Sequence, residues 1–409
     1  GYENESGDGK SIRGTQMTHH IPKEFEFAIA EAAFKKEGRP DLGAIVSKRP
    51  AAAAGVFTTN VFKAAPVLQA REMLDSRPEA RVILANSGQA NACTGDAGLA
   101  DCRESLKLAA KALKARARDV LPASTGVIGV RLKMDRFEAA LPRLRESLGQ
   151  ASPVDFARSI MTTDTFAKIS SRAVDAGGEA RVMGVAKGAG MICPDMATML
   201  AFIITDAEVP TEDWRHMIRI AADSSFNRIT VDGDTSTNDC LIGLANGASG
   251  VRPAGREMDA VAAAVVEVCR DLAYMIVQDA EGGTKVARIR VSGARDPREA
   301  EMAARAVGNS PLVKTALFGS DPNWGRIAAA MGRSGARFDP DKTSISIGGV
   351  EIFRAGVPAV DDVDAATAGK LDGRDVEIEI MLGSGEGEYV LLASDLTHDY
   401  VSINADYRT

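Results

Sequence analysis

The apolar positions in the first third of the chain follow two periods, the period of about two typical of strands and the period of about 3.6 typical of helices. Short apolar runs that end in polar or glycine residues predict strands at 45–46, 56–59 and 82–85. Segments 101–117 and 135–148 place apolar residues at helical spacing, and Pro142 is expected to kink or split the second helix. Strands and helices are therefore expected to alternate.

The middle of the chain continues this alternation. Segment 201–205 predicts a strand and segment 210–222 predicts an amphipathic helix. Segment 258–276 is rich in alanine and valine, and its apolar residues nearly encircle the helix, which predicts burial between layers. Segment 286–291 alternates as a strand, and the Asp-Pro pair that opens segment 296–308 predicts a capped helix start.

Two hairpins are predicted near the end of the chain. Segments 344–347 and 350–353 flank a Gly-Gly pair, where a two-residue turn needs positive φ. Segment 376–382 alternates strictly, and a glycine-rich turn at 383–387 is expected to lead it into a partner strand at 389–392. The whole pattern predicts a mixed α/β protein with much antiparallel sheet, and it marks no sharp domain boundary.

Composition narrows the class of function. The chain has 409 residues, 45% of them hydrophobic, which is enough for a large core. A net charge of -7 without a basic run disfavours nucleic acid or an anionic membrane as partner, so small molecules are expected. Apolar runs fall far short of the roughly 18 residues that span a bilayer, which indicates a soluble protein. Residues 1–17 are expected to be a disordered tail or a remnant added to the natural chain, with Met17 as the native start.

Cysteine and histidine usage argues against metal and disulfide chemistry. The five cysteines lack CxxC spacing, which predicts reduced thiols in a cytoplasm. The four histidines form neither a triad motif nor a metal motif. The loop VDGDTSTND at 231–239 resembles a cation loop but lacks the glutamate of an EF-hand, and GSGEGE at 383–388 lacks the Lys-Ser/Thr of a phosphate loop. No metal is expected.

Thr198 is the most unusual candidate for chemistry. It lies directly before the predicted strand, within the segment KGAGMICPDMATMLAFIITDA at 187–207. One interpretation is a β-branched residue that opens a strand, and the other is a nucleophile. A cut between Ala197 and Thr198 would free an α-amine beside the hydroxyl. Because an α-amine has a pKa of about 8, a useful fraction is a neutral base at neutral pH.

Segment 187–207 is very similar to the cleavage-site motif of the ornithine acetyltransferases (glutamate N-acetyltransferases), in which the chain cuts itself before the threonine of Ala-Thr-Met-Leu. The resemblance covers about Lys23 to Thr409. Its further motifs are GRPDLGAIVS at Gly38, AAGVFTTN at Ala53, ANSGQANACTGDAG at Ala85, STGVIG at Ser124, MTTDT at Met161, SFNRITVDGDTSTND at Ser225, QDAEGGTK at Gln278, VKTALFGSDPNWGRIAAAMGR at Val313 and YVSINADYRT at Tyr400.

The resemblance implies a layered α/β/β/α fold of the amino-terminal-nucleophile type and a chain cut into residues 18–197 and 198–409. The two pieces are expected to stay together and to form a heterotetramer. The implied reaction moves an acetyl group from N2-acetyl-L-ornithine to L-glutamate through acetyl-Thr198, in arginine biosynthesis. The resemblance implies no required cofactor, and it leaves open whether acetyl-coenzyme A also donates. The alternative is a self-cleaving aminopeptidase or amidohydrolase of similar fold, and a farther one is a silent binding protein.

The resemblance also assigns site residues. It implies that Thr125 and Gly126 form the oxyanion hole, a role that suits a hydroxyl and a backbone N–H. The implied substrate contacts are Thr162, Lys187, Thr198, Glu281, Asn404 and Thr409. Taken alone, the Ser-Thr-Gly run is a turn, and Lys187 and Glu281 are solvated surface charges. Our hypothesis pairs the lysine with the substrate carboxylate and the glutamate with its amine.

The turn before Thr198 departs from the family pattern. Cys193 stands where histidine or another residue is more often expected, and Asp195 stands where asparagine is more often expected. This difference is expected to alter the rate of self-cleavage more than the transfer. Cys193 is a rival nucleophile, although no neighbouring histidine or helix start activates it. The alternative for Cys193 is buried packing.

Overall fold

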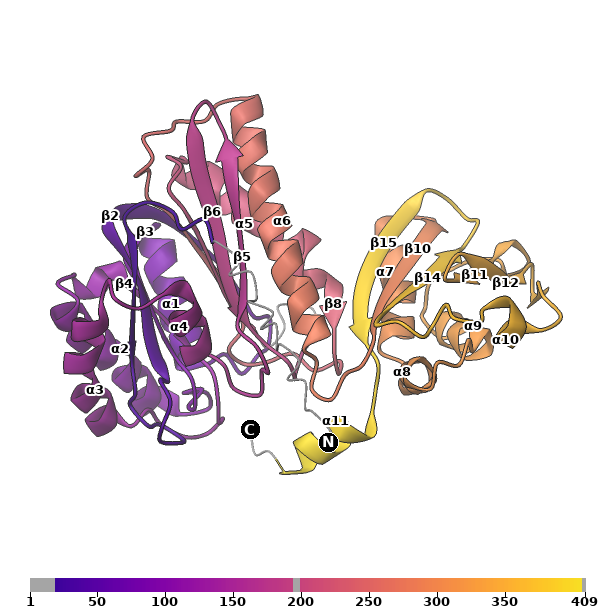
Figure 1. The fold of residues 1–409 in the computed structure, drawn as a ribbon, viewed down its shortest axis with the longest axis horizontal. Helices are drawn as coiled ribbons and strands as arrows, with labels where there is room; N and C mark the ends of the chain where they lie inside the picture. Colours follow the sequence, from indigo (N-terminus) through magenta and orange to yellow (C-terminus); the bar gives the residue numbers. More distant parts are fainter. Residues whose placement is uncertain (1–18, 194–198, 407–409) are drawn as a thin grey trace, which may run out of the picture.

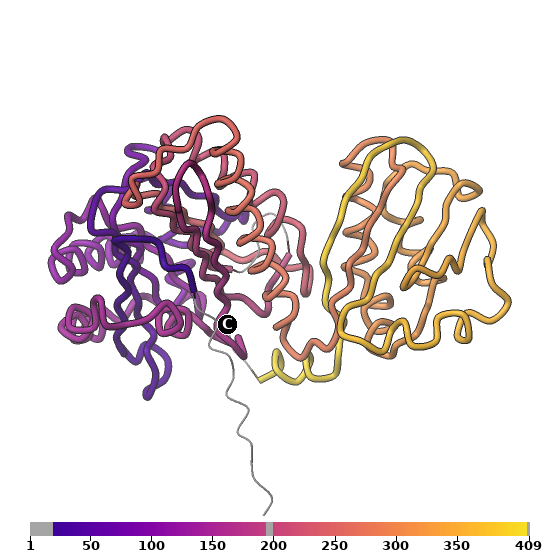
Figure 2. The backbone as a smooth tube through the Cα atoms, turned by 45° about the horizontal axis from the view of Figure 1, so that its top comes forward, coloured from indigo at the N-terminus to yellow at the C-terminus, as the bar shows by residue number. Residues whose placement is uncertain are grey.

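The computed structural model describes residues 19–193 and 199–406, which form two lobes. The first lobe is built on a sheet of eight strands and the second on a sheet of seven within the described ranges. Figure 2 shows the same separation from a second direction, with the chain crossing between the lobes after the long helix α6 (Arg256–Gln278). The tail predicted over residues 1–17 lies outside the described residues.

The first sheet has the strand order β4-β3-β2-β9-β7-β6-β5, and β1 also pairs with β2. Its strands are β1 (Phe25–Ala30), β2 (Leu42–Phe57), β3 (Glu79–Asn86), β4 (Val120–Ser124), β5 (Lys168–Asp175), β6 (Glu179–Lys187), β7 (Leu200–Thr205) and β9 (Cys240–Ala245). Most neighbours are antiparallel, while β3 with β4 and β7 with β9 are parallel. This confirms the predicted mixed α/β class.

Strand β2 joins the two halves of this sheet. Its first half pairs with β1 from Leu42 to Ser47, and its second half pairs with β9 from Ala52 to Phe57. The register shifts between Val46 and Ala51, where the chain is exposed. The prediction of two separate short strands was therefore wrong, because a polar interruption in one long strand resembles the end of a strand.

The buried side chains of the first lobe form three layers of packing around the sheet. An inner cluster takes Ile45, Ile83 and Leu121 from one half and Phe202 and Ile242 from the other, so the two halves face each other. A second cluster covers the outer face of β1–β4, and a third covers that of β6, β7 and β9. The predicted α/β/β/α layering is confirmed, and Figure 1 shows it from left to right.

Helices on the outer faces complete the first lobe. The helices packed on or beside β1–β4 are α1 (Ala65–Ser76), α2 (Gly95–Ala112) and α3 (Met134–Ser147). Helices α5 (Thr211–Ser224) and α6 pack on the other half of the sheet. Helix α4 (Pro153–Ser159) contacts both halves. Pro142 lies inside α3 without splitting it. Helix α6 does not lie between layers as predicted, since Glu267 and Arg270 keep one side of it exposed.

The second lobe is a sheet covered on one face by helices. Its strand order is β13-β12-β11-β14-β10-β15-β8. The strands are β8 (Ile229–Thr230), β10 (Val286–Ala294), β11 (Ser344–Ile347), β12 (Val350–Arg354), β13 (Val357–Pro358), β14 (Asp375–Met381) and β15 (Gly387–Ser394). Its helices are α7 (Pro297–Gly308), α8 (Pro311–Phe318), α9 (Trp324–Gly332) and α10 (Val363–Ala366), and α11 (His398–Asp406) returns to the first lobe. The capped start of α7 is confirmed, because Asp296 accepts the Glu299 N–H.

One of the two predicted hairpins is correct and one is wrong. Strands β11 and β12 pair across Gly348 and Gly349, as predicted. Strands β14 and β15 do not pair with each other, since β10 lies between them, parallel to β14 and antiparallel to β15. The loop from Gly383 crosses the end of β10, where a Cβ at Gly385 would lie 2.5 Å from the Ala294 oxygen.

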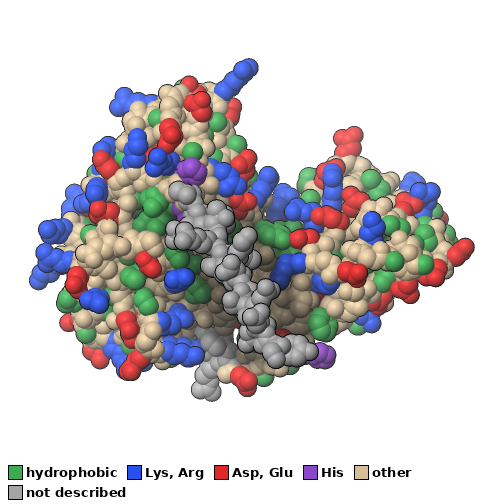
Figure 3. All heavy atoms as spheres, viewed as in Figure 1, with side chains coloured by type: hydrophobic (Ala, Val, Ile, Leu, Met, Phe, Trp, Pro, Cys, Tyr) green, Lys and Arg blue, Asp and Glu red, His purple; other side chains and the backbone are tan. Residues whose placement is uncertain are grey.

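The lobes meet at a groove beside α6. Figure 3 shows the notch between them, with Lys and Arg side chains on its walls. Arg228, Arg270, Tyr274 and Arg288 line this groove, whose volume is about 500 Å³. Within the described ranges, none of the helices combines the length and the apolar character needed to cross a membrane.

Candidate active site

A pocket of about 130 Å³ lies at one end of the layered lobe, where several strand ends meet. Strand β6 ends there at Lys187, β4 ends at Ser124, and β7 and β9 begin there. The lining residues are Thr125, Gly126, Ile128, Thr162, Thr163, Lys187, Gly190, Met191, Asp232, Asp234, Ser236, Asn238, Glu281, Tyr400 and Asn404. Every predicted site residue that the structure describes is in this set.

Thr125 and Gly126 form a strained turn directly after β4. Gly126 has a φ of 134°, and a Cβ there would lie 2.2 Å from the Gly88 carbonyl carbon. Only glycine can therefore hold this conformation. Within the described part of the chain, neither the Thr125 hydroxyl nor the Gly126 N–H has a hydrogen-bond partner. Both donors are thus available to a group in the pocket.

Asn238 holds this turn in place. Its Nδ2 donates to the Ala90 oxygen at 2.7 Å and to the Ser124 oxygen at 2.8 Å, and Ser124 in turn donates to Asn86 at 2.6 Å. All three side chains are buried. The residue before Thr125 is therefore fixed by hydrogen bonds to the end of strand β3 and to the loop that carries Asn238, which keeps the two pocket donors in one orientation.

Lys187 is a cation at the floor of the pocket. It is only 2% exposed, and its Nζ donates to Thr162 Oγ1 at 2.7 Å. The Asp164 carboxylate lies 3.7 Å from the same nitrogen. The prediction that Lys187 and Thr162 share the site fits this contact, whereas the alternative of Lys187 as a solvated surface charge is wrong.

Glu281 and Asn404 meet in another part of the pocket lining. Asn404 Nδ2 donates to Glu281 Oε2 at 2.7 Å, and the Glu281 N–H donates to the Ala189 oxygen at 3.0 Å. A Cβ at Gly190 would lie 2.3 Å from the Glu281 carboxyl carbon, so a glycine is needed for the glutamate to fit. The pocket therefore carries a cation and an anion on different walls.

The loop at 231–239, which resembles a cation loop in sequence, holds neighbouring segments together through Asp232. Asp232 accepts the N–H groups of Met191 and Ile192 at 2.7 and 2.8 Å and the Tyr400 hydroxyl at 3.0 Å. Burial raises the pKa of Asp232, against the lowering effect of these hydrogen bonds. The carboxylate thus ties the 188–193 loop to helix α11. Sequence reasoning missed this residue because nothing in its spacing marks its partners.

Asp239 holds the start of β7. Its Oδ1 accepts the Met199 N–H at 2.9 Å, and Met199 directly follows position 198 in the chain. The side chain is fully buried, Oδ2 has no partner among the described residues, and burial raises the pKa of this carboxyl well above its ordinary value. This buried acid was also missed from the sequence.

Several sequence predictions fall on residues that the structure does not describe. Ala197, Thr198 and Thr409 lie outside the described ranges, as does Asp195. Cys193 is described and half-buried; burial raises the pKa of its thiol, which disfavours the thiolate that a nucleophile needs. Among residues 19–193 and 199–406, no group of three or more His, Cys, Asp or Glu side chains is arranged to hold a metal ion.

Comparison with known proteins identifies the family. A profile described as the ArgJ family matches residues 26–409. The chain belongs to this family. It is 57% identical to the arginine biosynthesis bifunctional protein ArgJ of Nitratidesulfovibrio vulgaris, over 95% of this chain and 99% of that relative. It is 49% identical to the protein of the same name from Geobacter sulfurreducens, again over 95% and 99%.

Solved structures of the family align with parts of the chain. The ArgJ crystal structure from Bacillus halodurans is 37% identical and covers 50% of this chain and 98% of its own, with a TM-score of 0.48. The family assignment rests on the sequence matches, which extend over nearly the whole chain. Within this family, the pocket offers two neutral donors, a cation and an anion around one small space.

Proposed function

We propose that this chain transfers an acetyl group from N2-acetyl-L-ornithine to L-glutamate in arginine biosynthesis, with Thr198 as the acetyl carrier. The observation that supports this most is the pocket that brings Thr125, Gly126, Lys187 and Glu281 together. Its relatives are named as arginine biosynthesis bifunctional proteins, which agrees with an enzyme of that pathway. An aminopeptidase is not favoured, because relatives at this identity carry the biosynthetic name.

The enzyme would first cut its own chain. The Thr198 hydroxyl attacks the Ala197 carbonyl carbon, the peptide C–N bond breaks, and an ester to the threonine oxygen forms while the nitrogen gains a proton. Water then hydrolyses the ester and leaves a carboxylate on Ala197 and a free amine on Thr198. The resulting pieces are 18–197 and 198–409, and we expect two copies of each in a cytoplasmic heterotetramer.

Acetyl transfer then proceeds in two half-reactions. The Thr198 amine accepts the proton of its own hydroxyl as the oxygen attacks the acetyl carbonyl of N2-acetylornithine, and ornithine leaves with that proton. The Thr125 hydroxyl and the Gly126 N–H stabilise the tetrahedral oxyanion. The amine of glutamate next attacks acetyl-Thr198, and N-acetylglutamate departs. No cofactor is needed, and acetyl-coenzyme A is a candidate second donor.

The two charged walls account for the choice of amino acids. Both substrates share an α-carboxylate, which suits Lys187, and an α-nitrogen, which suits Glu281. Asn404 donates to Glu281 and Thr162 accepts from Lys187, and because both also line the pocket they are proposed as further substrate contacts. Because ornithine and glutamate differ in side-chain charge, the pocket must bind their shared α-carboxylate and α-nitrogen and make few specific contacts with the end of the side chain. Thr409 is the proposed final contact from the chain terminus.

Replacement of Thr198 by alanine tests the proposal. Purified wild-type protein should give a fragment whose mass begins at Thr198, and it should form N-acetylglutamate only when glutamate is supplied. The Thr198→Ala protein should remain one uncut chain without transfer, whereas Thr315→Ala, an exposed threonine of α8, should behave as wild type. Full transfer by an uncut chain would contradict the mechanism. Acetyl-coenzyme A in place of acetylornithine tests the second donor.

A further inference from the structure

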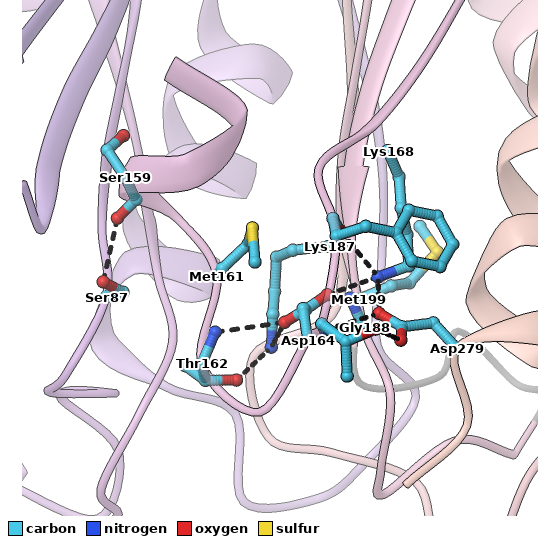
Figure 4. Close-up of polar contacts among 12 residues, drawn as sticks. Ser87, Ser159, Met161, Thr162, Asp164, Lys168, Lys187, Gly188, Met199 and Asp279 are labelled. Carbon is cyan, nitrogen blue, oxygen red and sulfur yellow. Dashed lines mark hydrogen bonds and ion pairs between the residues drawn. The ribbon is translucent and has the colours of Figure 1, made fainter. Parts of the chain in front are cut away.

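A row of four buried charges runs behind the pocket, in the order Asp279, Lys168, Asp164 and Lys187. Lys168 Nζ lies 2.6 Å from Asp279 Oδ2 and 2.8 Å from Asp164 Oδ1, and Lys187 Nζ lies 3.7 Å from Asp164 Oδ2. Figure 4 shows these side chains pointing toward one another from different segments. The signs alternate, so the row is neutral overall.

The row is almost completely removed from water. The side chains of Lys168 and Asp164 are 0% exposed, and those of Asp279 and Lys187 are 3% exposed. Burial alone would raise the pKa of Asp164, but Lys187 and Lys168 together hold it well below its ordinary value. Replacing such a buried network by apolar side chains is often neutral or stabilising. Stability alone therefore does not explain four charges at this place.

The middle of the row fixes the backbone around the pocket. Asp164 accepts the Gly188 N–H at 2.7 Å and the Thr162 N–H at 3.0 Å, so one carboxylate holds the residue after Lys187 and the residue that binds its Nζ. Figure 4 shows both contacts. The position of the Lys187 ammonium group is thus determined by Asp164.

The far end of the row lies close in the chain to Glu281. Asp279 directly follows helix α6 and stands two residues before Glu281. It also accepts the N–H of Thr165 at 2.9 Å and the Thr165 hydroxyl. The Glu281 N–H in turn donates to the oxygen of Ala189, two residues after Lys187. Lys187 and Glu281 are therefore linked by the charged row, by the Glu281–Ala189 hydrogen bond and by the short backbone stretches 187–189 and 279–281.

We propose that Asp164, Lys168 and Asp279 are positioning residues that fix the spacing between the Lys187 ammonium and the Glu281 carboxylate, and so select substrates with an adjacent carboxylate and nitrogen. This inference rests on the proposed function of the pocket. None of the three touches the pocket itself, since none lines it. They act through Lys187 and Glu281, and their loss should weaken amino-acid binding more than acyl chemistry.

The pair Thr165→Val and Thr165→Ser tests this at an exposed position. Valine removes the hydroxyl that bonds Asp279, whereas serine keeps it. Asp164→Asn is the stronger variant, because it removes the charge between the two lysines. We expect Asp164→Asn to raise KM for acetylornithine and glutamate about 10- to 100-fold, Thr165→Val to raise it severalfold, and Thr165→Ser to leave it unchanged.

The readout that separates positioning from damage is a substrate without either charge. p-Nitrophenyl acetate acetylates the nucleophile and releases p-nitrophenol, so its turnover depends on the nucleophile and the oxyanion donors alone. Turnover of this ester should stay within about threefold of wild type in each folded variant. Glu299→Gln, which breaks a pair with Arg337 in the second lobe, serves as the control.

Two outcomes would overturn the inference. One is an unchanged KM in folded Asp164→Asn and Thr165→Val. The other is an equal loss of ester and amino-acid turnover, which indicates general damage. If Asp164→Asn does not fold, the Thr165 pair decides by itself. Failure of the proposed function is distinct, because wild-type protein would then show no glutamate-dependent acetyl transfer.

Discussion

Replacement of Gly126 by alanine should abolish most acetyl transfer by moving the proposed oxyanion donors. The new Cβ would lie 2.2 Å from the Gly88 carbonyl carbon and 2.5 Å from the Gln89 nitrogen. Since carbon atoms normally approach to about 3.5 Å, the turn must move by roughly 1 Å. A displacement of about 1 Å at a reacting group typically costs about 100-fold in rate.

The expected result is a fall in kcat of about 100- to 1,000-fold, the range seen when one oxyanion donor is lost. KM for glutamate should change by less than about threefold, because Lys187 and Glu281 lie in other segments. Initial rates of N-acetylglutamate formation measure both constants. Tm from circular dichroism shows whether each variant is folded.

Gly129→Ala is a matched control in the same loop. Gly129 also has a positive φ, of 85°, but no atom lies within 4 Å of the Cβ position. Its replacement should cost about 1 kcal/mol of backbone strain and leave kcat near wild type. Wild-type kcat in Gly126→Ala, or an equal loss in Gly129→Ala, would refute the assignment of Gly126 to the oxyanion hole.

Three further variants test other parts of the structure. Burial lowers the pKa of Lys314 to about 8, so this side chain loses its proton in the folded chain at a lower pH than in the unfolded chain, where its pKa is 10.5. The free energy of unfolding should therefore rise by about 3 kcal/mol as the pH increases from 8 to 10.5. In urea unfolding, Lys314→Met should lose this rise. Asn238→Ala removes the bond to the Ser124 oxygen, and kcat should fall at least about 10-fold while Tm drops. Gly184→Ala places a Cβ 2.6 Å from Val268 and should destabilise the fold by about 1–3 kcal/mol without loss of kcat at low temperature.

Periodicity predicted many of the strands and helices because burial on one face imposes it, although strands β1, β5 and β6 were not predicted. Strand β14 illustrates this, since its side chains alternate strictly between buried and exposed. The partner of a strand is set by contacts distant in sequence, which periodicity does not report. The hairpin of β14 with β15 was predicted wrongly because strands adjacent in sequence were assumed to pair. In the sheet, β10 lies between them.

In the site, too, some residues were predicted from the sequence and others were not. Thr125, Gly126, Lys187, Glu281 and Asn404 were predicted through the family motifs, and the structure places them in one pocket. The residues that hold them were not predicted. Asp164 and Lys168 lie four residues apart, and Asp279 lies more than a hundred residues later, so only the fold shows that the three are buried together.

The order of strands in the first sheet has a consequence for a chain that is cut before residue 198. Strands β7 and β9 come from the later piece, yet they lie between β2 and β6 of the earlier piece. Folding before the cut is a unimolecular event, whereas reassembly of the denatured pieces requires two molecules to meet. Recovery after denaturation should therefore depend on protein concentration, and self-cleavage would make the folded state one that is formed once and kept by kinetics.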